Sequence, residues 1–185
     1  MEYVQPIRDM EMVETIQSYL KERNERDYVL FMVGITTGLR ISDILQLKVG
    51  DVQGTHIRRK EIKTGKGRRT PISPELRKAL SPYVKDKLDD EWLFLSRQKG
   101  REGNIKPIDR STAYRIIKEA ARKAGFRDNC GTHTMRKTFG YMHYKKWGNV
   151  AALQKIFNHD TELVTFAYIG LEDDFLDKTI MGLYR

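Results

Sequence analysis

Apolar residues recur at three- and four-residue intervals along most of the chain, which is the spacing of one helix face. Asp9 precedes the first such segment as a predicted N-cap, and Gly38 follows the second at a position where a helix ends. A later helix is predicted to bury Tyr114, Ile117 and Ala121. The predicted helices cover residues 9–23, 27–37, 74–87, 109–124, 150–157 and 161–168, with a short helix within residues 39–52.

The period changes between residues 55 and 72, where Ile57 and Ile62 favour strands on either side of a glycine-containing turn. This segment predicts an antiparallel β-hairpin. Residues 97–107 are rich in glycine and charge, and they predict an exposed loop. The whole pattern predicts an α+β fold that is mostly helical and carries a small antiparallel hairpin. The length predicts a single domain, residues 1–185.

The chain carries a formal net charge of +9, which favours a polyanionic partner. The predicted hairpin holds much of this charge, and Glu61 is the one acid among its basic residues. A hairpin of that density suits a phosphate backbone better than a protein core. The competing interpretation is a basic surface that is only solvated. The basic residues are Arg58, Arg59, Lys60, Lys63, Lys66, Arg68 and Arg69.

The sequence lacks the marks of a secreted, membrane-spanning or metal-dependent protein. A single cysteine, Cys130, excludes an intrachain disulfide and predicts a reducing compartment. Charged residues such as Arg8 interrupt any signal peptide, and no apolar run is long enough to cross a membrane. The four histidines lack the spacing of metal ligands, so no metal site is predicted. No glycine-rich phosphate loop is present, so no nucleotide or other cofactor is predicted.

One stretch, residues 132–168, concentrates residues suited to attack on a phosphodiester. His133 and Arg136 are three positions apart, so a helix would project them from one face. An arginine can hold phosphate oxygens bidentately, and histidines can move protons near neutral pH. His159 and Tyr168 close the stretch, and a tyrosine can serve as a covalent nucleophile.

This pattern resembles the catalytic domain of the tyrosine recombinase, or phage integrase, family. The family box H-x-x-R followed by L-x-x-x-x-x-H-x-x-x-x-x-T-x-x-Y occurs here with every named position filled. An upstream segment resembles the family's first arginine box, with Arg40 leading a short helix. Asn158 stands where the family usually has glycine, and asparagine also tolerates a left-handed backbone. The matched positions are His133, Arg136, Leu153, His159, Thr165 and Tyr168.

The resemblance implies a role for each residue of the site. Tyr168 attacks the scissile phosphate and keeps the 3′-phosphoryl end, which leaves a free 5′-hydroxyl. Arg40 and Arg136 bind the non-bridging oxygens of that phosphate. His133 acts on the proton of Tyr168, and His159 hydrogen-bonds the phosphate.

The hairpin of the family carries a catalytic lysine eight positions before a proline, and counting back from Pro71 gives Lys63. Lys63 is therefore expected to donate a proton to the departing 5′ oxygen. Lys66 is the competing assignment. Asp43, three positions after Arg40, is expected to hold that arginine in place. The residues expected to contact DNA are Arg58, Arg59, Lys60, Lys66, Arg68 and Arg69.

The resemblance implies a site-specific DNA recombinase or integrase, encoded by a bacterium, phage or mobile element and located in the cytoplasm with the nucleoid. Its partner would be double-stranded DNA. No cofactor would be needed, because a phosphotyrosine link conserves the energy of the broken bond. One alternative is an enzyme like the type IB topoisomerases, which relaxes supercoils by the same chemistry. Another is a regulator that binds DNA without cutting it.

The two ends of the chain bear on its assembly. The N-terminal core-binding domain with which family members commonly clamp DNA is expected to be absent. The chain would then be an excised catalytic domain or a short single-domain member that inverts DNA segments. Residues 171–185 alternate acids with apolar residues. In the family such a segment docks on a neighbouring subunit, whereas the alternative is a helix folded on its own domain. A monomer is expected in free solution, and a homo-oligomer on DNA.

Overall fold

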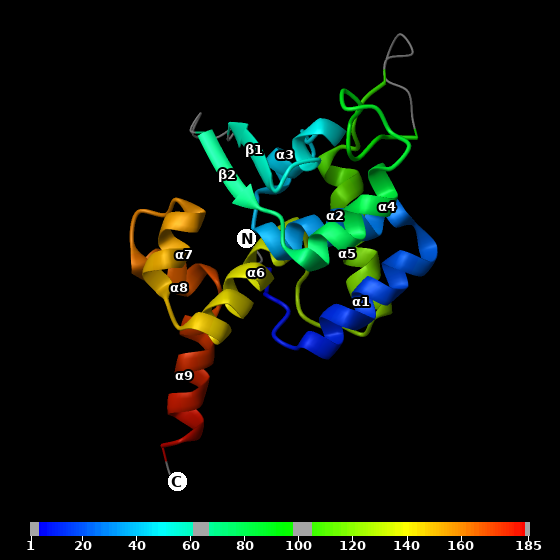
Figure 1. The fold of residues 1–185 in the computed structure, drawn as a ribbon. Coiled ribbons are helices and arrows are strands. Elements are labelled where there is room, and N and C mark those ends of the chain that lie inside the picture. Colours follow the sequence, from blue (N-terminus) through cyan, green and yellow to red (C-terminus); the bar gives the residue numbers. More distant parts are fainter. Residues whose placement is uncertain (1–3, 61–66, 98–104, 184–185) are drawn as a thin grey trace.

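A computed structural model describes residues 4–60, 67–97 and 105–183, apart from the side chains of Arg59, Lys60 and Arg68. Within these ranges the fold is mostly helical, with one two-stranded antiparallel sheet, as predicted (Figure 1). The elements are α1 (Met10–Arg23), α2 (Glu25–Thr37), α3 (Ile41–Ile44), a 3₁₀ helix (Val49–Val52), β1 (His56–Lys60), β2 (Gly67–Pro71), α4 (Pro74–Val84), α5 (Arg110–Lys123), α6 (Thr132–Trp147), α7 (Val150–Phe157), α8 (Glu162–Tyr168) and α9 (Leu171–Met181).

Local signals in the sequence account for where several helices begin and end. The Asp9 side chain accepts a hydrogen bond from the Glu11 backbone N–H at the start of α1, as expected of an N-cap. α2 ends at Gly38, whose φ of 60° lies in the left-handed region that glycine adopts without strain. Ser73 caps α4 in the same way as Asp9 caps α1.

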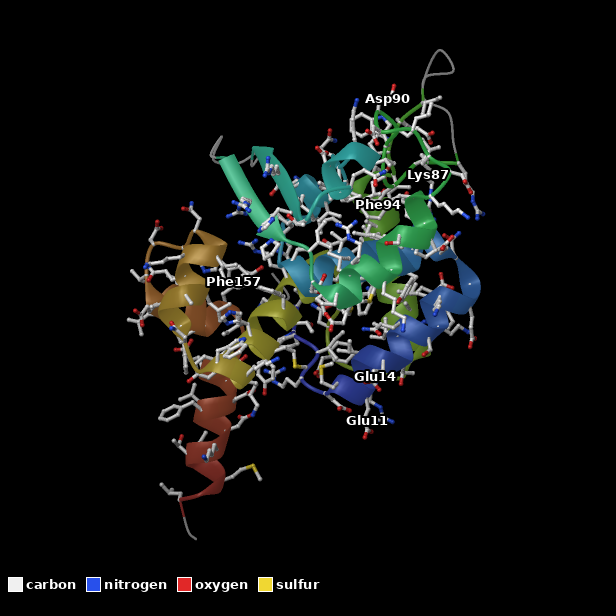
Figure 2. The ribbon with its side chains drawn as sticks, viewed as in Figure 1. Glu11, Glu14, Lys87, Asp90, Phe94 and Phe157 are labelled. Carbon is white, nitrogen blue, oxygen red and sulfur yellow. The ribbon has the colours of Figure 1, made fainter. Side chains whose placement is uncertain are left out.

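The larger hydrophobic cluster forms around α2, with α1, α4 and α5 packed about it. Phe31 on α2 and Phe94, which follows α4, are fully buried there, and Figure 2 labels Phe94 within this part of the molecule. Helix α5 departs from the prediction at one position. Tyr114 is 39% exposed, while Ala113 and Ile117 are buried. The buried face of the helix therefore includes Ala113 and Ile117 and leaves Tyr114 at its edge. Lys118 donates a hydrogen bond to the Tyr114 hydroxyl.

A smaller hydrophobic cluster forms from the end of α6 together with α7, α8 and the start of α9. Its buried members include Leu153, Phe157 and Ile169. Helix α6 passes between the two clusters, since Met135 belongs to the larger and Tyr141 to the smaller (Figure 1). Residues of α6 near this boundary can therefore contact both parts of the molecule at once.

Helix α9 points away from the rest of the molecule (Figure 1). Its first turn is held to the body, because Arg8 forms an ion pair with Asp174 at 2.7 Å and donates a hydrogen bond to the Gly170 carbonyl. Beyond that turn its apolar side chains are at least half exposed. These are Phe175, Leu176, Ile180 and Met181, followed by Leu183.

Candidate active site

Two arginines from distant parts of the chain meet at one backbone carbonyl. Arg40 lies at the N-cap of α3, and its Nη2 donates to the Phe157 carbonyl oxygen at 3.3 Å. Arg136 lies on α6, and its Nη2 donates to the same oxygen at 3.0 Å. Figure 2 labels Phe157 near α6 in the smaller part of the molecule. The two guanidinium groups therefore lie side by side at the boundary between the two clusters.

The environment of Arg136 explains how a full charge is kept inside the protein. Its side chain is 3% exposed, and burying a charge costs free energy unless hydrogen bonds compensate. Its Nη1 donates to the Gly38 carbonyl, and its guanidinium carbon lies 4.3 Å from the centroid of the Phe157 ring. Two neighbouring cations repel each other at this spacing. An anion bound between them would relieve that repulsion, as a phosphate does.

The second pair of residues, His133 and Tyr168, places a base beside a phenol. Nδ1 of His133, at the N-terminal end of α6, lies 3.3 Å from the hydroxyl of Tyr168, at the end of α8. Burial raises the pKa of Tyr168, and the charges of Arg136 and Arg40 lower it only in part. The hydroxyl therefore keeps its proton at neutral pH and needs a base to act as a nucleophile.

His133 has the protonation state that such a base requires. Desolvation lowers the pKa of His133, and the positive charges of Arg136 and Lys137 lower it further. The imidazole is therefore neutral at pH 7, and Nδ1 can accept the proton of the Tyr168 hydroxyl. The geometry suits proton transfer from the phenol to the histidine.

His159 is oriented by a short chain of hydrogen bonds. The Thr165 hydroxyl donates its one proton to the Thr161 carbonyl oxygen at 3.1 Å. Nδ1 of His159 lies 3.1 Å from the same hydroxyl, so Nδ1–H must be the donor in that bond. The His159 ring also packs edge to face against the Tyr168 ring, with centroids 5.0 Å apart.

The turn before His159 accounts for the one departure from the family box. Asn158 ends α7 with φ 52°, in the left-handed region, where asparagine is the residue after glycine best able to fit. The Gln154 amide donates to the carbonyl oxygens of His159 and Asp160, at 3.2 and 3.0 Å. Asparagine thus preserves the turn, as expected from the sequence.

The hairpin presents positive charge beside this site. β1 and β2 pair so that Arg58 stands opposite Arg69, and both side chains are exposed. Like charges directly opposite each other destabilise a sheet, so this pairing favours a polyanion as partner. A cavity of about 600 Å³ lies between β2 and the α6–α7 pair, and Arg69 and Lys155 contribute to its lining.

The predicted site residues are placed as follows. Arg40, His133, Arg136, His159 and Tyr168 come together, although three separate parts of the chain supply them. Asp43 is buried on α3, and its support of Arg40 stays a prediction. Arg59 and Arg68 are opposite each other in the strand register, as are Lys60 and Gly67. Lys63 and Lys66 lie outside the described residues.

Sequence reasoning missed two contributors to this site. The first is the Phe157 carbonyl, which accepts from both arginines; a backbone group carries no side-chain signal. The second is Lys137, whose ammonium nitrogen lies 5.2 Å from the centroid of the Tyr168 ring. Its position directly after Arg136 was visible, but its burial was not.

In the described part of the chain, no three histidine, cysteine or acidic residues are arranged to hold a metal ion. No helix there has the length and apolar character needed to cross a membrane.

Comparison with known proteins gives consistent matches over most of the chain. The phage integrase family matches residues 8–174. The chain is 45% identical to the probable integrase/recombinase YoeC of Bacillus subtilis strain 168, over 94% of this chain and 93% of that protein. A crystal structure of XerA recombinase superposes with a TM-score of 0.76 and 25% identity, over 98% of this chain and 65% of that one. A lambda integrase dimer bound to a COC′ core site has a TM-score of 0.67 and 15% identity, over 89% of this chain and 47% of that one.

Proposed function

The chain belongs to the phage integrase family, and on that premise we propose that it is a recombinase that cuts and rejoins double-stranded DNA at specific sites through Tyr168. The observation that carries the proposal is that two pairs of residues with complementary chemistry lie in one site. A phenol lies beside a neutral base, and two arginines that suit one phosphate lie next to them. A regulator that only binds DNA would have no need for this arrangement.

The cleavage step transfers a phosphoryl group from the DNA strand to the enzyme. The Tyr168 hydroxyl gives its proton to Nδ1 of His133, and the phenol oxygen forms a bond to phosphorus. The bond from phosphorus to the 5′ oxygen breaks. The 3′ end stays attached to Tyr168, and the 5′ oxygen leaves with a proton as a hydroxyl. The reverse reaction with the 5′-hydroxyl of another strand rejoins the DNA and restores the phenol.

Arg40, Arg136 and His159 would act on the charge that develops on the phosphate. Two guanidinium groups placed in advance stabilise that charge without reorganising. His159 uses Nδ1–H on Thr165, so its Nε2 can donate to a phosphate oxygen only when the ring carries a second proton. Cleavage requires a neutral His133 to accept the proton of the phenol, and the rate should fall as acid protonates that imidazole ring.

Lys63 remains the proposed donor to the leaving 5′ oxygen, with Lys66 as the competing residue. Loss of a general acid costs about 10² to 10⁴ in rate. A 5′-bridging sulfur in the substrate makes the leaving group independent of that proton. Such a substrate should restore cleavage by Lys63→Ala. Restoration of Lys66→Ala alone would transfer the role to Lys66.

The test of the proposed function is a covalent adduct. A pool of random-sequence duplexes is first selected for binding to the protein, and a nick is placed in the selected half-site so that cleavage is trapped. The wild-type protein should form an adduct whose peptide map places DNA on Tyr168. Tyr168→Phe should form none and should bind the half-site with unchanged affinity, since only the hydroxyl is lost.

Three outcomes would count against the proposal. An adduct that persists in Tyr168→Phe, or that maps to Tyr141, would remove the assigned nucleophile. Binding without any adduct in the wild-type protein would indicate a regulator. Relaxation of supercoiled plasmid without exchange between selected sites would indicate topoisomerase-like activity.

We further propose that α9 docks on a second copy of this chain when both are bound to DNA. The apolar side chains from Phe175 to Leu183 support this proposal, because they are exposed and belong to neither core cluster. The acids of α9, such as Asp173 and Asp177, would be repelled by DNA and attracted by a protein of net charge +9. The lambda integrase that shares this fold was solved as a dimer on a core site. A single short helix makes a small interface, so a monomer is expected without DNA.

Removal of the residues after Asp174 tests this docking. The truncation keeps the buried Leu171 and the Arg8–Asp174 ion pair, so the body of the protein should fold unchanged. Binding to paired half-sites should lose cooperativity, whereas affinity for a single half-site should not change. Unchanged cooperativity in gel-shift titrations would show that α9 plays no part in coupling the subunits.

A further inference from the structure

A buried lysine lies against the nucleophile. Lys137 follows Arg136 on α6, and its side chain is 6% exposed. Its Nζ lies over the Tyr168 ring, 5.2 Å from the centroid. Burial of an ammonium group costs free energy that packing alone does not recover. A lysine at this position therefore places an ammonium group against the nucleophile, where a methionine or leucine would place none.

Tyr168 changes charge during the proposed reaction, so the ammonium group of Lys137 faces a different charge before and during the attack. A neutral phenol attracts a cation only through the quadrupole of its ring. When the phenol loses its proton, the same cation faces a full negative charge at close range, and the attraction rises accordingly. Lys137 thus interacts more strongly with Tyr168 at the moment of attack than in the resting enzyme, which is the condition for accelerating a reaction.

The surroundings of Lys137 shift its pKa in both directions. Burial lowers the pKa of Lys137, the Asp173 carboxylate at the start of α9 raises it, and Arg8 lowers it. The other titratable or charged groups near the phenol are His133, Arg136, Arg40 and His159. Asp173 is the acid in this set, so it supports the charge on Lys137 from the segment that directly follows the nucleophile.

We infer that Lys137 is a positioning residue for Tyr168, holding its ring and stabilising the phenolate through the ammonium group as the proton passes to His133. The inference rests on the proposed role of Tyr168 as nucleophile. The same contact assists rejoining, because the phenolate is then the leaving group. The competing role for Lys137 is structural, as a long side chain that fills space between α6 and the start of α9.

The first experiment measures the contact without DNA. A fluorinated tyrosine is placed at position 168 by amber suppression, and its ionisation is followed by ¹⁹F NMR. Fluorine makes the phenol more acidic, which moves its ionisation to lower pH and away from that of a lysine. Lys137→Met, which keeps length without charge, should lower the acid dissociation constant of the phenol by about 10- to 200-fold, from the Coulomb energy at 5.2 Å with an effective dielectric constant of about 20 to 40. Lys137→Arg should stay within about threefold of the wild-type value, since the charge is kept.

Lys145→Met is the matched control, because Lys145 is exposed on the same helix. It should leave the phenol unchanged. If Lys137→Met also leaves the phenol unchanged, with a circular dichroism melt like that of the wild-type protein, then Lys137 is only structural. If Lys137→Met does not fold, Lys137→Gln takes its place, and the same comparison with Lys137→Arg decides.

The second experiment separates this inference from the proposed function. Single-turnover adduct formation is measured on the nicked half-site that the wild-type protein selects. Lys137→Met should slow it about 10-fold and shift its rising limb to higher pH, with half-site affinity unchanged, whereas Lys137→Arg should recover most of the rate. Absence of an adduct in the wild-type protein would overturn the role of Tyr168. An adduct that forms equally fast in Lys137→Met would overturn the inference about Lys137 alone.

Discussion

Substitution of Gly140 by alanine tests whether the position of Tyr168 depends on close packing between α6 and α8. A Cβ atom at Gly140 would lie 2.5 Å from Cγ2 of Ile169 and 2.8 Å from Cε2 of Phe157. Ordinary contacts of a Cβ atom begin near 3.4 Å, so these neighbours must move by about 1 Å. Ile169 directly follows Tyr168, and Phe157 supplies the carbonyl that both arginines share. The substitution therefore displaces the nucleophile and the phosphate site together.

The expected effects on stability and on rate differ in size. Alanine favours a helix by about 1 kcal/mol relative to glycine, and overpacking costs about 1 to 3 kcal/mol. The free energy of unfolding should therefore fall by about 0 to 2 kcal/mol, which urea denaturation measures. A displacement of about 1 Å at a reacting group can cost about 100-fold in rate. Adduct formation by the folded variant at saturating protein should accordingly slow by about that factor.

Gly54→Ala is the control, because no heavy atom lies within 4 Å of a Cβ atom at that position. It should change the free energy of unfolding by no more than a few tenths of a kcal/mol, and it should leave the rate of adduct formation unchanged. A rate for Gly140→Ala within threefold of the wild-type rate would refute the reasoning. It would show that Ile169 and Phe157 can give way without moving Tyr168 from its productive position.

Three further predictions concern metal, protons and salt. Cleavage of the nicked half-site should continue in excess EDTA, since Arg40 and Arg136 neutralise the phosphate in place of metal ions; strict dependence on Mg²⁺ would contradict this. Because the pKa of His133 is lowered, the rate should hold down to about pH 6.5 and fall only below that value as the ring gains a proton; a fall that begins above pH 7 in single-turnover assays would argue against His133 as the base. Arg69→Ala should weaken half-site binding and reduce the slope of log affinity against log salt by about 1, as expected for one lost phosphate contact; an unchanged slope in fluorescence anisotropy would place Arg69 off the DNA.

The elements of this fold could be predicted because their signals are local. A helix depends on contacts three and four residues apart, so periodicity, the Asp9 cap and the Gly38 stop could be recognised in the sequence. The hairpin and its charge were equally visible. Tyr114 was assigned to the wrong face because one helical stripe allowed two neighbouring choices, and packing against the rest of the protein selected between them. The order of the motif residues identified the family before any contact was known.

The contacts that make the site belong to the folded molecule alone. Arg136 meets the Gly38 carbonyl 98 positions away, and the Phe157 carbonyl joins it to Arg40. The position of Lys137 directly after Arg136 did not predict its burial, yet it is buried against Tyr168 while lysines later on the same helix are exposed. Local spacing orients a side chain around its own helix, whereas its partners depend on how two separate clusters pack against α6. That packing is a property of the whole chain, so the electrostatic environment of the nucleophile emerges only with the tertiary fold.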